Sequence, residues 1–236
     1  MSLGVSNIVF RYPSEPCPIF HGLTFKIDEP GFYALFGLSG AGKSTLARIL
    51  AGLLEPEEGD VPHHGRLRLL YSHNEERLPV WEDCYKHLNS VIPEENYRVL
   101  EEFLEIALHG VNLAVRFNEL SLGQKNRVNL ARYIAQDFDC LIMDEALSNV
   151  DEPTREAILR FLKQRFPKKI FLYVSHNVME VVRFSKEVLC LTNPGDSHSV
   201  KIRAVHGLDD RSGESSTDEE SLKQTGLMVL EAVSGN

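Results

Sequence analysis

The amino-acid sequence predicts an α/β fold with a parallel sheet and crossover helices, an N-terminal antiparallel β subdomain and a small helical lobe. Two patterns predict the parallel core. An apolar run at 32–36 precedes a glycine-rich loop and a helical stretch at 46–51, and apolar runs at 140–143 and 170–174 flank a helical stretch at 155–165. Strand, helix and strand in this order indicate parallel strands joined by crossover helices.

Two further patterns predict the smaller parts. Residues 3–12 and 19–27 are expected to be the first strands, separated by a proline-rich turn, and the second run alternates apolar and polar residues as a half-buried strand does. Residues 67–72 predict another strand. From about 73 to 118 the pattern becomes helical, with apolar side chains at helical spacing among acidic ones, namely Tyr97, Leu100, Leu104 and Leu108. We therefore expect the helical lobe at about 73–118.

The C-terminal part divides by composition. The folded domain is predicted to span 1–206. Residues 207–221 are acidic, small and nearly free of apolar side chains, which predicts a flexible linker. Apolar residues return in the tail, 222–236, which is expected to dock as a short helix or strand.

The composition excludes several classes of protein. Of the 236 residues, 43% are hydrophobic and 25% are charged, which is ordinary for a globular protein. No run approaches the roughly 18 apolar residues of a membrane span, and no secretory signal opens the chain. The formal net charge of −9 argues against a broad nucleic-acid surface, so we expect no nucleic-acid partner.

The loop after the apolar run at 32–36 is a complete phosphate-binding loop (P-loop). It consists of Gly37, Leu38, Ser39, Gly40, Ala41, Gly42, Lys43, Ser44 and Thr45. The glycines let the backbone turn tightly and direct N–H groups at phosphate oxygens, Lys43 reaches the outer phosphates, and Ser44 offers its hydroxyl to Mg²⁺. The following helix start adds free N–H groups and a positive dipole end. The sequence thus predicts a P-loop NTPase core that binds a nucleoside triphosphate with Mg²⁺.

The apolar run at 140–143 ends in two carboxylates, Asp144 and Glu145. In P-loop enzymes the aspartate at this strand end helps to hold Mg²⁺ opposite the P-loop hydroxyl. Glu145, one residue further on, is suited to orient or deprotonate an attacking water. An ordinary acidic strand exit is the structural alternative.

Ser121 and Gln124 form a Ser-x-x-Gln pattern at the start of another helix. This pattern predicts a capping box, in which each side chain satisfies a free backbone N–H group. A helix start capped by serine is also a phosphate site, so capping and phosphate contact are compatible.

These motifs together resemble the nucleotide-binding subunit of ATP-binding cassette (ABC) transporters. The order is the P-loop, then Leu-Ser-Leu-Gly-Gln at 120–124, then the strand with Asp144 and Glu145, then a strand followed by His176, and the resemblance covers about residues 3–206. It implies an ATP-binding and ATP-hydrolysing subunit that uses Mg²⁺ and lies on the cytoplasmic face of a membrane. The implied partners are integral-membrane transporter subunits and a second copy of the chain or a homologous ATPase subunit, paired head to tail around two ATP molecules.

The resemblance also implies roles for single residues. Tyr12 matches the aromatic residue that stacks on adenine. His176 matches the switch histidine that contacts the γ-phosphate, and residues 146–151 match the loop that crosses the dimer interface. The family's signature, which contacts the γ-phosphate bound by the second subunit, is matched by Ser121, Gly123 and Gln124.

The sequence departs from the family pattern at two places. Leu122 replaces the first glycine of the signature. The glutamine that joins the core to the helical lobe and touches Mg²⁺ is also missing. Aligning Leu78-Pro79 with the Leu-Pro that often follows this glutamine puts His73 at its position, and Asn74 is the alternative. Because Mg²⁺ prefers oxygen ligands, His73 would act through a hydrogen bond or a water.

Two functions remain open from the sequence. The first is the ATPase subunit of a membrane transporter, for which the segment at 78–81 and the helical lobe are the expected docking surface. The alternative is a soluble ABC-type ATPase that powers protein assembly or nucleic-acid processing without a membrane partner.

Overall fold

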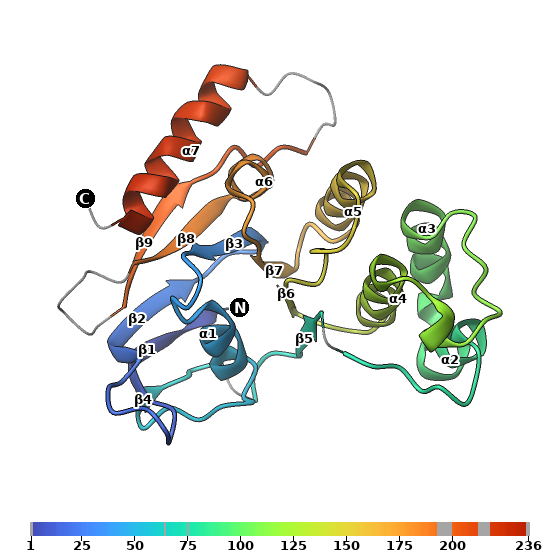
Figure 1. Cartoon of the computed structure of the whole chain (residues 1–236), viewed down its shortest axis with the longest axis horizontal. Helices are drawn as coiled ribbons and strands as arrows, with labels where there is room; N and C mark the ends of the chain where they lie inside the picture. The colour runs from blue at the N-terminus through green and yellow to red at the C-terminus, as the bar shows by residue number, and fades with distance from the viewer. Residues whose placement is uncertain (1, 64, 75, 193–199, 212–217, 235–236) are drawn as a thin grey trace.

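The main sheet runs through the centre of the structure, a computed structural model that describes residues 2–63, 65–74, 76–192, 200–211 and 218–234 (Figure 1). Among these residues, six strands form this sheet in the order β5-β6-β7-β3-β8-β9. Their bounds are Leu69–His73 (β5), Cys140–Asp144 (β6), Ile170–Val174 (β7), Gly31–Gly37 (β3), Glu187–Thr192 (β8) and Lys201–His206 (β9). Neighbouring strands from β5 to β8 are parallel, and β9 pairs antiparallel with β8. The predicted parallel core is confirmed, and the sequence reading missed β8 and β9.

A smaller antiparallel sheet packs beside the main one. Within the described residues it has the order β2-β1-β4, with bounds Leu3–Phe10 (β1), Phe20–Ile27 (β2) and Glu58–Asp60 (β4). The predicted N-terminal β subdomain is thereby confirmed. Its inner face and helix α1, Lys43–Leu50, bury one face of the main sheet.

The main sheet is buried on both faces, which explains why its strands are continuous apolar runs. In β3, Tyr33 and Leu35 face the cluster with the small sheet and α1, whereas Phe32, Ala34 and Phe36 face a second cluster built from helices. This second layer contains α5, Glu152–Arg165, and α6, Val178–Phe184. No helix in the described part of the chain has the length and apolar character needed to cross a membrane.

Three helices gather at one end of the molecule, beyond β5 and far from α7 (Figure 1). They are α2 (Cys84–Val91), α3 (Tyr97–Ala107) and α4 (Leu122–Ile134), and α3 and α2 both contact α4. A bridge between Asp83 and Arg116 closes the segment that carries the first two helices. Residues 73–118 therefore contain α2, α3 and a 3₁₀ turn at Glu94–Asn96, and a second 3₁₀ turn, Phe117–Glu119, ends one residue beyond them. Asp83 caps α2 by accepting from the Lys86 N–H, which fixes where that helix begins.

The structure differs from the predicted linker, 207–221, at both ends. The N–H groups of Leu208, Asp209 and Asp210 donate to carbonyl groups at the end of α6, so the segment after β9 is docked. Helix α7, Glu219–Ser234, begins inside the predicted linker and packs on α6, β8 and β9. Residues 212–217, 235 and 236 lie outside the described residues. Of the two forms expected for the tail, a short helix or a strand, the structure has a helix over 222–234.

Buried Lys163 on α5 explains why an acidic segment docks here. Its ammonium donates to the carbonyl oxygens of Phe184 (2.7 Å) and Asp210 (2.6 Å) and pairs with the Asp209 carboxylate at 2.9 Å. Arg183 donates to the Asp210 carboxylate at 3.0 Å. Burial lowers the pKa of Lys163, and Asp209 opposes that change. The composition of residues 207–221 alone predicts a solvated linker, because the buried lysine that binds this segment lies on α5, far away in the sequence.

Lys163→Met is expected to lower the free energy of unfolding by about 3 kcal/mol, because two carbonyl groups lose their buried donor and the Asp209 carboxylate keeps only its exposed partner Arg211. The measurement is urea unfolding, with hydrogen exchange to follow residues 207–211 and α7. Lys168→Met, at an exposed position of the following loop, is the matched control and should change little. Equal stability of both variants would contradict the role given to Lys163.

Candidate active site

The predicted phosphate-binding and acidic residues meet at one edge of the main sheet. Because β3, β6 and β7 are parallel, their carboxyl ends lie at the same edge. β3 ends at Gly37, where the P-loop begins, and β6 ends at Asp144. In the register of the sheet, Asp144 lies between His73 of β5 and Val174 of β7. Residues from four separate parts of the sequence are thereby brought together.

The P-loop connects β3 directly to α1. Gly42 is the N-cap of α1 with φ 89°, and no side chain caps this helix start. A Cβ atom at position 42 would lie 2.9 Å from Ile19 Cγ2, so both the conformation and the packing require glycine. Leu38, Ser39 and Gly40 are exposed. The first N–H groups of α1 are thus available to an anion.

Lys43 is buried inside the loop. Its ammonium donates to the carbonyl oxygens of Gly37 (2.8 Å) and Leu38 (3.0 Å). Burial lowers the pKa of Lys43, and the carboxylates of Glu145 and Asp144 oppose this change. The cation is therefore held next to both the loop and the acidic pair.

Ser44 and Asp144 face each other across the site. The Ser44 hydroxyl donates to Asp144 Oδ1 at 3.1 Å, and the Tyr71 hydroxyl donates to Asp144 Oδ2 at 2.8 Å. Burial, followed by the interaction with Asp144, raises the pKa of Tyr71 well above its ordinary value. Both carboxylate oxygens of Asp144 therefore have a hydroxyl partner.

Tyr12 lies beside α1. Its hydroxyl is 3.2 Å from Thr45 Oγ1, and its ring makes an edge contact with Phe10. Stacking on adenine itself stays a prediction.

Glu145 and His176 are in direct contact. His176 Nε2 lies 2.6 Å from Glu145 Oε1, and the Asn74 amide donates to Glu145 Oε2 at 3.4 Å. Glu145 has φ 53°, a left-handed conformation that is uncommon for a residue with a side chain. His73 instead packs its ring against Tyr71 in a tilted contact, with ring centroids 5.5 Å apart. Of the two candidates for the missing glutamine, Asn74 is the one in contact with Glu145.

The predicted capping box at the start of α4 is confirmed. The Ser121 hydroxyl accepts from the Gln124 N–H at 3.3 Å, and the Gln124 side chain accepts from the Ser121 N–H at 2.9 Å. Ser121 is thus engaged within its own helix, and Figure 1 shows α4 well away from α1. The signature and the P-loop of one chain do not form a single site.

Gly123 packs against the loop that follows Glu145. A Cβ atom at position 123 would lie 2.2 Å from the carbonyl oxygen of Asn149, closer than any side chain allows. Leu122 is 53% exposed and lines the edge of a cavity, so the chain accommodates leucine where the family has glycine. The glycine that the fold requires is the second one of the signature.

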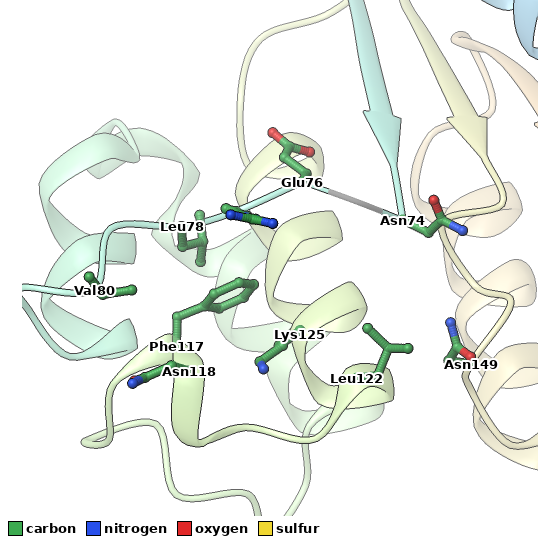
Figure 2. A pocket seen from close by; sticks show the side chains of 10 residues that line it. Asn74, Glu76, Leu78, Val80, Phe117, Asn118, Leu122, Lys125 and Asn149 are labelled. Atoms are coloured by element: carbon green, nitrogen blue, oxygen red, sulfur yellow. The ribbon is translucent and has the colours of Figure 1, made fainter.

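A cavity of about 720 Å³ lies between this helix start and the segment after β5 (Figure 2). Figure 2 shows Leu122 and Lys125 on α4, with Asn149 on the neighbouring loop. The other residues around the cavity are Asn74, Glu76, Arg77, Leu78, Val80, Phe117 and Asn118.

The sequence patterns did not predict a buried ion pair next to the loop that follows Glu145. Arg155 on α5 pairs with Glu180 on α6 and also donates to the Val150 carbonyl at 2.9 Å. Glu180 accepts further hydrogen bonds from the hydroxyls of Tyr173 (2.7 Å) and Ser175 (3.0 Å). The pair therefore ties the loop after Glu145 to the segment that carries His176. An acidic residue four positions after His176 was the available signal.

Comparisons with known proteins agree with this geometry. Residues 20–148 match the family described as ABC transporter. An aliphatic sulfonates import ATP-binding protein of Rhodococcus jostii is 31% identical over 86% of this chain and 84% of the relative. A spermidine/putrescine import ATP-binding protein of Acetivibrio thermocellus is 30% identical over 90% of this chain and 67% of the relative. In structure, the chain is similar to an ATP-binding cassette solved as a dimer in a post-hydrolysis state with ADP and Pi, with a TM-score of 0.69, 21% identity, and 88% of this chain and 99% of that chain covered.

The chain belongs to the ABC transporter family. It is an ATP-binding subunit of the kind found in these transporters, an ABC-type ATPase. The family and the fold expected from the sequence are therefore confirmed. The roles assigned to single residues stay predictions.

Gly123→Ala is expected to destabilise the chain by about 1–3 kcal/mol, because the added methyl group must displace the backbone at Asn149. ATP hydrolysis should fall as well, since the displaced loop directly follows Glu145. Thermal unfolding and steady-state hydrolysis are the measurements. Gly226→Ala in α7 is the matched control, because its new Cβ atom meets only Met179 Sδ at an ordinary 3.5 Å. If both variants behave like wild type, the close packing at Gly123 is not a requirement.

Proposed function

We propose that two copies of this chain, or one copy and a homologous ATPase subunit, close head to tail around two ATP molecules and drive an import system in a membrane. One observation carries the proposal. Residues 38–40 of the P-loop and Ser121 at the start of α4 are each exposed at the surface, but α1 and α4 lie apart in one chain. A nucleotide on the P-loop of one copy would therefore meet the signature of the other. The similar ATP-binding cassette that was solved as a dimer with ADP and Pi supports the formation of a dimer.

Hydrolysis would use the residues that meet at the edge of the sheet. Lys43 and the N–H groups of the P-loop would neutralise phosphate charge as it develops. Glu145 would accept a proton from the attacking water. His176, in contact with Glu145, would hold the carboxylate in place and contact the γ-phosphate. Loss of the γ-phosphate contacts would then open the dimer.

The donor set at Ser44 and Asp144 fits Mg²⁺. Their oxygen atoms already converge to 3.1 Å, and both are hard oxygen ligands of the kind that this ion prefers. When bound, Mg²⁺ would supply positive charge to the phosphate oxygens. Asn74 donates its amide N–H to Glu145 and also carries an amide oxygen that could bind the ion, whereas His73 offers only ring nitrogen, so we assign the role of the missing glutamine to Asn74.

The membrane subunits would dock at the end that carries α2 and α3. Val80, Trp81 and Tyr85 are apolar side chains exposed by 53%, 77% and 55%, and the cavity beside Leu78 and Val80 adjoins them. This surface corresponds to the docking segment expected from the sequence. The subunit would thus lie on the cytoplasmic face of the membrane. The two relatives are named for import of different cargoes, so the proposal includes import and no particular cargo.

Glu145→Gln is expected to trap an ATP-bound dimer, because it keeps the shape of the side chain but removes the base. Hydrolysis should fall by about 10²–10⁴-fold, as for loss of a general base. The measurement is light scattering during size exclusion in Mg²⁺ and ATP, with Glu231→Gln at an exposed position of α7 as the control. A variant that binds ATP yet stays monomeric, while the wild type hydrolyses ATP, would contradict the head-to-tail scheme.

A further inference from the structure

The Tyr71 hydroxyl contacts the Asp144 carboxylate, yet Tyr71 belongs to none of the sequence motifs and has no role in the proposed mechanism. It donates to Asp144 Oδ2 at 2.8 Å, on the opposite side of the carboxylate from Ser44, which contacts Oδ1. Asp144 is only 5% exposed. Two hydroxyls from different elements, α1 and β5, therefore fix the plane of a buried carboxylate.

The sheet determines where this hydroxyl lies. Tyr71 is in the middle of β5, and its backbone is paired with Ile142 two residues before Asp144. Its ring packs against the apolar cluster on that face of the sheet and makes a tilted contact with the His73 ring. The guanidinium of Arg48 on α1 also interacts with the phenol oxygen. Contacts with residues of β5, β6 and α1 thus hold the side chain of Tyr71 in one orientation.

An aspartate that is free to rotate would lose part of its contribution to a metal site. A carboxylate binds a cation well only when one oxygen faces it, and partners outside the ligand set commonly fix that orientation. Tyr71 occupies the oxygen that points away from Ser44, which leaves Oδ1 directed at the Ser44 side. The only groups in direct hydrogen-bond contact with the carboxylate among the described residues are these two hydroxyls.

We propose that Tyr71 is a positioning residue for Mg²⁺, which holds Asp144 with Oδ1 turned toward the Ser44 hydroxyl. This inference rests on the proposed function, in which Ser44 and Asp144 hold the ion. Tyr71 touches neither nucleotide nor metal in this role. It acts through Asp144 alone.

The test compares Tyr71→Phe with wild type, using Mn²⁺ as a spectroscopic probe of the metal site in the presence of ADP. The half-saturating Mn²⁺ concentration is expected to rise by about 10-fold, the lower end of the range found when the partner of a metal ligand is removed. Binding of ADP in EDTA should be unchanged, because the P-loop is intact. Hydrolysis should fall at low Mg²⁺ and recover at saturating Mg²⁺, which a general loss of structure would not produce.

Tyr33→Phe is the matched control, because its buried hydroxyl donates to the Glu29 carbonyl at 3.1 Å, outside the site. It should leave the Mn²⁺ titration unchanged. A second measurement combines Tyr71→Phe with Asp144→Asn. If Tyr71 acts through Asp144, the Tyr71 substitution should weaken Mn²⁺ binding no further in the Asp144→Asn background.

Two failures can be told apart. A wild-type chain whose ADP complex does not bind Mn²⁺ would overturn the proposed metal site itself. A wild-type chain that binds Mn²⁺, with an identical titration for Tyr71→Phe, would overturn only the role of Tyr71. Additive losses in the double variant would also overturn it, since Tyr71 would then act on metal binding without Asp144.

Discussion

The parallel register of β5, β6, β7 and β3 is the constraint on which the site depends. Alternate residues of β6 enter two different apolar clusters, Leu141 and Met143 on one face and Cys140 and Ile142 on the other. A slip by one residue would exchange these faces, so burial on both sides fixes the register. The same register sets Asp144 beside His73 and Val174 and therefore aligns the acidic pair with the P-loop.

Short contacts within one chain connect the Ser121 helix start to the segment that carries His176. Gly123 packs on Asn149, Arg155 holds the Val150 carbonyl, and Glu180 links Arg155 to Ser175, the residue before His176. The exposed start of α4 and His176, at the carboxyl edge of the main sheet, are thus parts of one packed unit. In the proposed dimer, each such unit would contact the nucleotides of both copies.

Sequence patterns predicted the parts of the structure that depend on neighbours along the chain. Strand, loop and helix around Lys43, and the strand end at Asp144, follow from local order and from the rule that parallel strands end at one edge. Tyr71 and Glu180 were missed because their partners lie 73 residues away and on another helix, respectively. The acidic segment at 207–211 was misjudged for the same reason, since buried Lys163 is its counter-ion. The choice between His73 and Asn74 required the position of Glu145 in space.

The central claim is that each nucleotide is enclosed by the P-loop of one copy and the signature of the other. The most direct measurement mixes two variants in the Glu145→Gln background, Lys43→Ala, which impairs the P-loop, and Ser121→Arg, which blocks the signature. Nucleotide retained after rapid gel filtration is then counted. The account predicts little retention by either variant alone and, in the mixture, heterodimers that hold one nucleotide per two chains. Retention by the Ser121→Arg variant alone at the wild-type level, or none in the mixture, would contradict it.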